Sequence, residues 1–309
     1  MSPSRHESNP RSRLSTEHTM RASDGGGKIM DWIVLRRAAR ALRLAGFVAL
    51  GACTHLPGQD LNQQRLSDAM RSRPIVLLGE VHDNAEQHAL RAQALRELLA
   101  SGARPALLME QFDRERQGDI DRAMAQPDAT ADDVIKAAGA QGIGWAWPLY
   151  RPFIALALEY RLPLIAANVS RADARRVSQE GLSATGFDGS VPAGIESYQT
   201  NTILASHCGM LNEAQARRMA TAQVARDQFM ARLLSEYSKR GAVLLAGNGH
   251  VRNDVGVPTW LPPAVRQRSV GIGLLETGES SAEAYDRVIT TAAPAARPDP
   301  CEGMRRPAS

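Results

Sequence analysis

Short uncharged runs alternate with longer stretches of helical periodicity along most of this chain, beginning near residue 74. Uncharged runs of this kind are typical of parallel strands buried on both faces, whereas apolar residues three and four positions apart indicate amphipathic helices. The predicted strands are residues 75–78, 106–109, 163–167, 242–246, 269–275 and 284–289. The predicted helices are, approximately, residues 84–100, 114–125, 130–138, 148–160, 169–180, 195–205 and 211–239. This alternation predicts an α/β fold with a mostly parallel central sheet flanked by helices.

The stretch between residues 169 and 240 departs from the alternation because it contains no strand signal. Three helical segments fill it, together with a loop at 181–194 that is rich in Gly, Ser and Pro. We therefore predict a helical cap (169–240) over the carboxyl edge of the sheet, within an α/β domain of residues 74–290. Residues 53–73 are interpreted as a tether, and the Pro- and Ala-rich residues 291–309 as a disordered tail.

An export signal is indicated ahead of this domain. Four arginines between positions 36 and 43 precede the apolar run 44–50, which continues into Leu50-Gly51-Ala52-Cys53. A basic region, a short apolar region and small residues before a cleavage point are typical of such signals, and the run is too short to span a bilayer. The sequence resembles a bacterial lipobox, which implies that Cys53 becomes the lipidated first residue of the mature protein. The alternative is an ordinary signal with an incidental cysteine.

The length of the N-terminal segment suggests that it has two parts. Export signals usually span about 15–30 residues, so a start at Met30 would give residues 30–52 the expected length. Residues 1–29 are interpreted as an overextended start or a disordered leader. Removing residues 1–52 takes away nine of the 37 Lys and Arg residues and four of the 33 Asp and Glu residues, which leaves 28 basic and 29 acidic side chains. A near-neutral mature surface gives no indication of nucleic-acid binding.

Polar residues with useful chemistry follow several of the predicted strands. The motif Gly-x-x-His occurs after two strands and ends in His82 and His250, which lie 168 positions apart. Glu80 also follows the first strand, Glu110 the second and Asn168 the third. Because ligands of open α/β sheets bind beyond the carboxyl ends of the strands, we expect these side chains to form one site. A strand must return to solvent in any case, but His and Glu are residue types that bind cations or transfer protons.

The order of these motifs along the chain is characteristic. They are Gly79-Glu80-Val81-His82-Asp83-Asn84, Met109-Glu110-Gln111-Phe112, Trp147-Pro148-Leu149-Tyr150-Arg151-Pro152, Ala166-Ala167-Asn168, Arg226-Asp227-Gln228-Phe229-Met230-Ala231 and Gly247-Asn248-Gly249-His250. Together with the lipobox, this ordered set resembles the ChaN family of haem-binding lipoproteins, which is grouped with the Tiki and TraB proteins and has a fold similar to the erythromycin esterases. The resemblance covers roughly residues 70–275.

The resemblance implies a lipoprotein of the bacterial envelope that binds haem and acts with other haem-uptake components in iron acquisition. It also implies a homodimer as one state of assembly. Thr54 rather than Asp follows Cys53, which in many Gram-negative bacteria favours sorting to the outer membrane. The partners expected are therefore haem, a membrane reached through the lipid anchor, and uptake proteins.

Haem needs an axial ligand from His, Tyr, Met or Cys in a mostly apolar slot. The predicted haem-binding residues are His82, His250, Tyr150, Tyr198, His207, Asn168 and Arg226. For Tyr150, packing is as good an explanation as ligation. His207 lies in a predicted loop, where most histidines are solvated, and Arg226 could equally belong to a solvated helix face. Because ligation requires the neutral imidazole, affinity through His82 or His250 is expected to fall below about pH 6.

Two other functional classes remain open at this stage. In a metal-dependent hydrolase, His82, His250 and Glu80 would hold a divalent ion, and Glu80 or Glu110 would activate water. In a non-catalytic envelope scaffold, the same residues would form a vestigial site. No Gly-x-x-x-x-Gly-Lys-Ser/Thr, Gly-x-Ser-x-Gly or His-Glu-x-x-His motif occurs, so phosphate-loop, serine-hydrolase and zincin chemistry are not indicated.

Two cysteines remain besides the one predicted to carry lipid. Cys208 and Cys301 form an even pair, and in an oxidising periplasm they could form a disulfide that ties the tail to the body of the domain.

Overall fold

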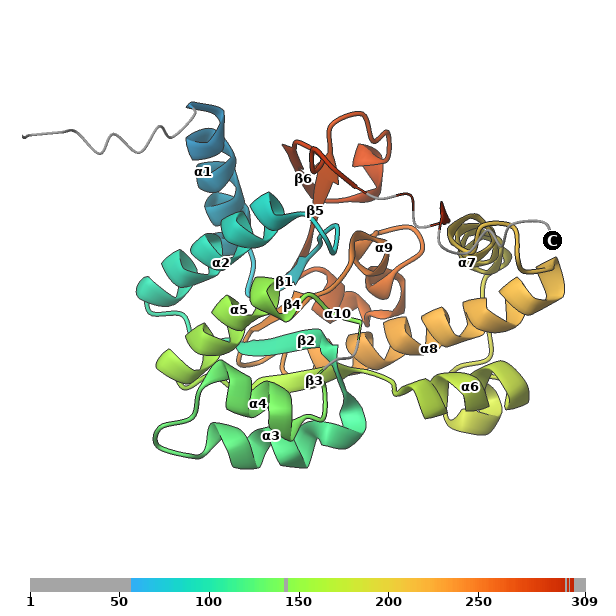
Figure 1. Ribbon diagram of the computed structural model, residues 1–309, viewed down its shortest axis with the longest axis horizontal. Helices are drawn as coiled ribbons and strands as arrows, with labels where there is room; N and C mark the ends of the chain where they lie inside the picture. Colours follow the sequence, from blue (N-terminus) through green and yellow to red (C-terminus); the bar gives the residue numbers. More distant parts are fainter. Residues whose placement is uncertain (1–56, 142–143, 298, 300, 303–309) are drawn as a thin grey trace, which may run out of the picture. The chain divides into compact units, whose positions relative to one another are not determined.

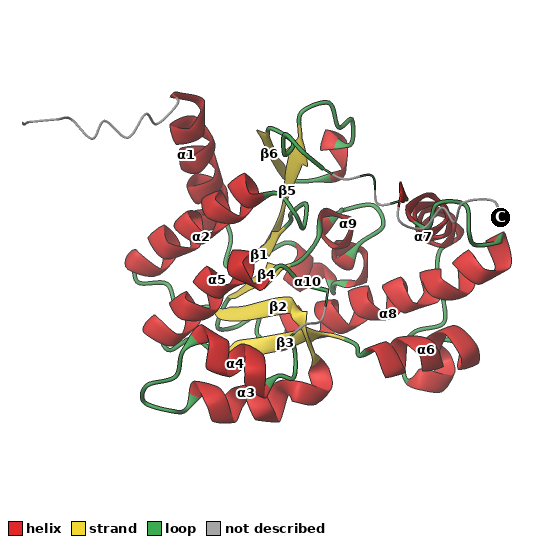
Figure 2. Ribbon diagram, viewed as in Figure 1, coloured by secondary structure: helices red, strands yellow, loops and turns green. Residues whose placement is uncertain are grey.

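A computed structural model describes residues 57–141, 144–297, 299 and 301–302. Within this part of the chain the strands form one six-stranded, entirely parallel sheet, with the order β3-β2-β4-β1-β5-β6 (Figures 1 and 2). The strands are β1 (Ile75–Leu78), β2 (Ala106–Asp113), β3 (Leu164–Asn168), β4 (Ala242–Leu245), β5 (Ser269–Glu276) and β6 (Arg287–Thr291). The predicted α/β class is therefore confirmed.

The two faces of the sheet bury two separate apolar clusters. In β1, Val76 and Leu78 pack into one cluster, whereas Ile75 and Leu77 pack into the other. This division follows from the alternation of side chains along a strand, and it explains why a centrally placed strand contains no charged residue.

Helices cover both faces of the sheet (Figure 2). The first cluster is closed by α1 (Pro57–Arg71), α2 (Ala85–Ala100), α3 (Gln117–Met124), α4 (Ala131–Ala137) and α5 (Trp147–Glu159). The second is closed mainly by α6 (Arg171–Glu180), α7 (Ala193–Ser206), α8 (Glu213–Glu236) and α9 (Asn248–Val251), with the short α10 (Pro263–Arg266) beside them. Short 3₁₀ helices occupy Arg114–Arg116 (η1), Ser183–Thr185 (η2), Val257–Trp260 (η3) and Ala282–Ala284 (η4).

The interpretation of residues 53–73 as a tether is wrong for the part that the structure describes. Residues 57–71 form the helix α1, and its side chains Leu66 and Met70 are fully buried in the core. Their spacing of four residues is the ordinary helical repeat, but only two or three apolar positions carry the pattern, since most of this helix is polar. The predicted signal segment and Cys53 lie outside the described residues.

The predicted end of the domain at residue 290 is also wrong, because ordered structure continues beyond it. The last strand extends to Thr291, and beyond it Arg297 forms ion pairs with Asp83 and Glu276. A disulfide joins Cys208 to Cys301, with the two Cα atoms 5.6 Å apart. The Pro- and Ala-rich composition predicts disorder here. The prediction fails because one arginine and one cysteine make the contacts that hold the segment, and composition does not reveal such single contacts. No helix in the described residues is long and apolar enough to cross a membrane.

Candidate functional site

The carboxyl ends of β1, β2, β3 and β4 meet around one open pocket. Its volume is about 690 Å³. The polar lining includes His82, Glu110, Asn168, Arg226 and His250, and the apolar lining includes Trp145 and Val169. Parallel pairing places these ends at one edge, because Leu78 lies opposite Leu245 and Met109 lies opposite the same residue. The convergence predicted from the strand ends is therefore found for His82, Glu110, Asn168 and His250, whereas Glu80 is not part of the lining and Arg226 comes from a helix.

Each Gly-x-x-His motif makes room for the other. A Cβ atom on Gly247 would lie 3.0 Å from His82 Cε1 and 3.1 Å from His82 Nε2. A Cβ atom on Gly79 would overlap Oδ1 of Asn248 in the second motif, and it would lie 2.8 Å from Val251 Cγ2 and 3.0 Å from the carbonyl oxygen of Ile272. The glycines are thus required for close approach of the two segments rather than for turn geometry.

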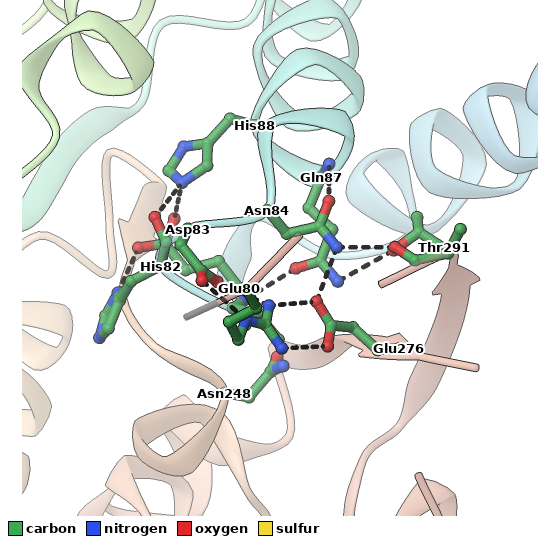
Figure 3. Close-up of polar contacts among 12 residues, drawn as sticks. Glu80, His82, Asp83, Asn84, Gln87, His88, Asn248, Glu276 and Thr291 are labelled. Carbon is green, nitrogen blue, oxygen red and sulfur yellow. Dashed lines mark hydrogen bonds and ion pairs between the residues drawn. The ribbon is translucent and has the colours of Figure 1, made fainter. Parts of the chain in front are cut away.

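His82 presents its imidazole to the pocket. Its side chain is half exposed, and its Nδ1 lies 2.8 Å from Glu80 Oε1 (Figure 3). The ring meets Trp145 edge-on, with centroids 5.0 Å apart. Because the carboxylate accepts the Nδ1 hydrogen, Nε2 is the nitrogen left as an electron-pair donor.

Glu80 lies beneath His82 and does not line the pocket. Its side chain is fully buried, its Oε1 accepts a hydrogen bond of 2.6 Å from the Tyr150 hydroxyl, and its Oε2 forms an ion pair with Arg91. His88 Nε2 lies 3.4 Å from the same Oε2. Burial lowers the pKa of Arg91 to about 10, so the guanidinium remains charged at neutral pH. Surrounded by these donors, Glu80 orients His82 instead of facing a ligand.

His250 is enclosed by two carboxylates. Its Nδ1 lies 2.6 Å from Asp227 Oδ1 and its Nε2 lies 3.4 Å from Glu110 Oε1. Glu110 Oε2 in turn accepts a hydrogen bond of 2.8 Å from the Gly247 backbone N–H. Burial disfavours the charged ring, but attraction to Glu110 and Asp227 outweighs burial and raises the pKa of His250 to about 10. With Nδ1 bonded to Asp227 and Nε2 in an ion pair with Glu110, the ring of His250 is held in its charged form, whereas ligation would require the neutral ring.

Glu110 is ionised for the same reason. Burial alone would raise the pKa of its carboxyl group, but the charge of His250 lowers that pKa to about 2. Asp227, which the sequence placed next to Arg226 without a definite role, is fully buried, and its pKa is raised by burial. A buried imidazolium between two carboxylates is a stable internal ion cluster that lines the pocket on one side.

The predicted tyrosine ligands do not present an oxygen to the pocket. Tyr150 is fully buried, donates to Glu80, and has its pKa raised by burial. It packs edge-on against His88 and Trp145, so the packing alternative describes it. Tyr198 lies under the guanidinium of Arg252, 4.8 Å from the ring centroid, and is not part of the pocket lining.

His207 is also outside the pocket lining. It follows the last residue of α7, and its Nδ1 lies 2.8 Å from the Ile203 carbonyl oxygen. Sequence reasoning could not place it, because the segment between α7 and α8 runs away from the edge of the sheet.

Several residues of the site carry no signal in the sequence. Arg91 is fully buried in the middle of an otherwise ordinary helix, and its partner Glu80 is eleven positions earlier in the chain. Arg116 in η1 and Arg171 at the start of α6 line the pocket beside Arg226. Arginines on predicted helices are usually solvated, so only the three-dimensional arrangement identifies these.

The predicted metal-binding set is not assembled. Among the described residues, no group of three or more His, Cys, Asp or Glu side chains is placed to hold a metal ion. The reason is visible in the contacts, because Glu80 is paired with Arg91 and His250 is held between two carboxylates.

Comparison with protein families matches residues 66–261 to the family described as "Haem-binding uptake, Tiki superfamily, ChaN". A search among curated proteins finds no match. Among solved structures, "Cofacial heme binding to ChaN of Campylobacter jejuni" is similar with a TM-score of 0.60 and 19% identity, over 74% of this chain and 90% of the other.

Weaker similarities accompany this one. The type III effector HopBA1 has a TM-score of 0.43 and 14% identity over 76% of this chain and 93% of its own. The erythromycin esterase EreC has a TM-score of 0.39 and 15% identity over 69% of this chain and 72% of its own. Scores this low support no argument about function.

Proposed function

This chain belongs to the ChaN family of haem-binding uptake proteins in the Tiki superfamily, and we propose that it binds haem in the pocket at the carboxyl edge of its sheet. ChaN of Campylobacter jejuni binds heme cofacially, which supports the same ligand class here.

The observation that carries the proposal is the state of His82. Its Nδ1 is held by a buried carboxylate at 2.8 Å, while the ring is half exposed at the pocket. A histidine ligand whose second nitrogen donates to a carboxylate is fixed in tautomer and orientation. When bound, haem would supply an iron atom that the His82 imidazole would hold. The contacts of Tyr150 and His250 commit those side chains elsewhere.

The pocket suits a flat ligand of this size. Its volume of about 690 Å³ lies within the range of about 300–1,000 Å³ that is usual for small-molecule sites. Trp145 and Val169 supply apolar surface, and Ala138, Gly139, Ala140, Gly144 and Ala172 leave space along the walls because their side chains are small or absent.

A haemin titration tests the assignment. The mature protein should give a saturable Soret shift, and His82→Ala should abolish the spectral signature of imidazole ligation. His207→Ala is the matched control, because it removes a histidine that lies outside the pocket lining. An unchanged spectrum in His82→Ala would contradict the assignment of the ligand, and a wild-type protein that never saturates would contradict haem binding itself.

We further propose that the protein is an exported lipoprotein that acts in iron uptake. The Arg-rich segment, the short apolar run and Cys53 support lipidation, and Thr54 supports sorting to the outer membrane. Metabolic labelling with palmitate should mark the wild type but not Cys53→Ser. Label retained in Cys53→Ser would refute lipidation at this residue, and recovery of the wild type in the inner membrane would refute the sorting.

A helical cap and a dimer are the remaining parts of the proposal. Helices α6 and α8 contribute Arg171, Ala172, Gln223 and Arg226 to the pocket lining, which supports a covering role for part of residues 169–240. Sedimentation with and without haemin tests the dimer, since a strictly monomeric species under both conditions would exclude it.

A further inference from the structure

Three arginines from three separate elements line the same pocket as His82. Arg116 comes from η1, Arg171 from the start of α6 and Arg226 from the middle of α8. Of these three, the sequence pattern singles out Arg226 alone as a predicted haem-binding residue, without naming the part of the ligand that it contacts, and it gives no role to Arg116 or Arg171. The carboxylates in the pocket lining are Glu110 and Asp113, so the three arginines outnumber them.

Arg226 is the most enclosed of the three, and its hydrogen bonds go to neutral groups. Its Nε donates to Asn168 Oδ1 at 3.0 Å and its Nη1 donates to Gln223 Oε1 at 3.1 Å. No carboxylate of the described chain lies within ion-pair distance of it. The nearby carboxylates of Asp227 and Glu110 form ion pairs with His250 instead. A guanidinium enclosed in this way retains positive charge that an anionic ligand can neutralise.

Arg171 and Arg116 stand at the open part of the pocket. Arg171 is exposed and makes no hydrogen bond or ion pair with any other described residue. Arg116 is also exposed, and its ion pair with Asp119 is a long one, at 3.3 Å. Exposed pairs of this kind are weak and exchange readily with other partners.

We propose that Arg116, Arg171 and Arg226 bind the carboxylate groups of the ligand, so that the pocket selects a flat tetrapyrrole dicarboxylate whether or not it carries iron. This inference rests on the proposed function, since it names the part of the ligand that is recognised apart from its metal. Guanidinium forks match carboxylates in geometry, and their charge-assisted hydrogen bonds are stronger than neutral ones. His82 then distinguishes the iron-bearing ligand, and the arginines determine affinity for the ring system as a whole.

Three ligands separate the two contributions. Haemin has iron and two carboxylates, metal-free protoporphyrin has only the carboxylates, and protoporphyrin dimethyl ester has neither. Binding of all three can be followed by quenching of tryptophan fluorescence, because Trp145 lines the pocket. Soret spectra of haemin report iron ligation independently.

The variants are Arg171→Gln, Arg226→Gln and Arg226→Lys, with Arg217→Gln as the matched control. Arg217 is on the same helix as Arg226, is exposed, and pairs with Glu196 and Glu213 away from the pocket. Because Arg171 makes no hydrogen bond or ion pair with another described residue, we expect Arg171→Gln to keep the fold, so it tests the inference even if Arg226→Gln fails to fold.

We expect Arg171→Gln and Arg226→Gln to weaken binding of both haemin and metal-free protoporphyrin by about tenfold each, as loss of one charge-assisted hydrogen bond implies. Arg226→Lys should recover part of that loss. The dimethyl ester should bind weakly and equally to all variants, and Arg217→Gln should match the wild type.

The possible outcomes test carboxylate recognition separately from haem binding. Haem binding stands but carboxylate recognition is overturned if haemin binds the arginine variants as tightly as the wild type. The same conclusion follows if the wild type binds the dimethyl ester as tightly as metal-free protoporphyrin. If metal-free protoporphyrin binds in an arginine-dependent way while haemin shows no imidazole ligation, carboxylate recognition stands and the role of His82 falls. If no ligand binds, both are overturned.

Discussion

Replacing Gly247 with Ala tests whether the small residue in the second Gly-x-x-His motif is needed for the position of His82 in the first. The added Cβ would lie 3.0 Å from Cε1 and 3.1 Å from Nε2 of His82, and 3.9 Å from Glu110 Oε2. The two ring contacts are shorter than ordinary carbon contacts, so the imidazole must move by a few tenths of an ångström. It can do so only by straining its 2.8 Å contact with Glu80 or its edge contact with Trp145.

The size of the effect follows from what must shift. Overpacking in a closed core costs about 1–3 kcal/mol, and because His82 is half exposed we expect about 1 kcal/mol for Gly247→Ala. Gly79→Ala should cost about 3 kcal/mol, because its Cβ would meet Val251 Cγ2 at 2.8 Å and the backbone oxygen of Ile272 at 3.0 Å, which have little freedom to move. Gly249→Ala is the control, since nothing lies within 4 Å of its added Cβ.

The assay combines denaturant unfolding with a haemin titration of each variant. Gly247→Ala should combine the small loss of stability with haem affinity weakened by about tenfold, which corresponds to about 1.4 kcal/mol. Gly249→Ala should stay within about 0.5 kcal/mol of the wild type and bind haem normally. If Gly247→Ala and Gly249→Ala behave alike in both measurements, the reasoning about mutual seating of the motifs is refuted.

Three further predictions concern the buried charges and the covalent link. Arg91→Met should lower the free energy of unfolding by about 3–5 kcal/mol in urea, because it leaves the Glu80 carboxylate buried without its cation, and a loss below 1 kcal/mol would contradict this. The stability that the Glu110–His250 pair contributes should decline as pH falls from the ordinary Glu pKa of 4.5 towards about 2, and again as pH rises from the ordinary His pKa of 6.5 through about 10. Glu110→Gln should reduce both declines in pH-dependent denaturation and lower the His250 pKa measured by NMR. Unchanged pH profiles in this variant would contradict the pairing. Cys301→Ser should cost about 2–5 kcal/mol under oxidising conditions and match the reduced wild type, and equal stability of oxidised wild type and variant would show that the disulfide is not formed.

The sequence was sufficient for the sheet and for its functional edge. Uncharged runs such as 75–78 and 242–246 can only be buried, and polar residues directly after them must emerge where parallel strands end together. His82, Glu110 and His250 were therefore found without knowledge of their contacts.

The roles of those residues could not be predicted in the same way. His82 and His250 follow identical motifs, yet one faces the pocket with a free nitrogen and the other is an imidazolium held by two carboxylates. The difference comes from Asp227 on α8 and from Arg91 on α2, whose distances from the histidines depend on helix packing. Local pattern contains no information about which buried charges meet across the fold.

The tail beyond β6 has a consequence for the order in which the site becomes complete. The loop after His82 is held by residues near the other end of the chain, since Asn84 donates to Glu276 (Figure 3). Asn84 also donates to the Ala292 carbonyl, and Asp83 pairs with Arg297. Synthesis proceeds from the N-terminus, so Arg297 is made 214 residues after its partner. A growing or shortened chain that ends before residue 292 already contains every side chain that faces the pocket but none of these late anchors except Glu276. Full anchoring of the loop beside the pocket is thereby coupled to completion of the polypeptide, because a nascent chain still lacks the contacts of Asn84 with the Ala292 carbonyl and of Asp83 with Arg297.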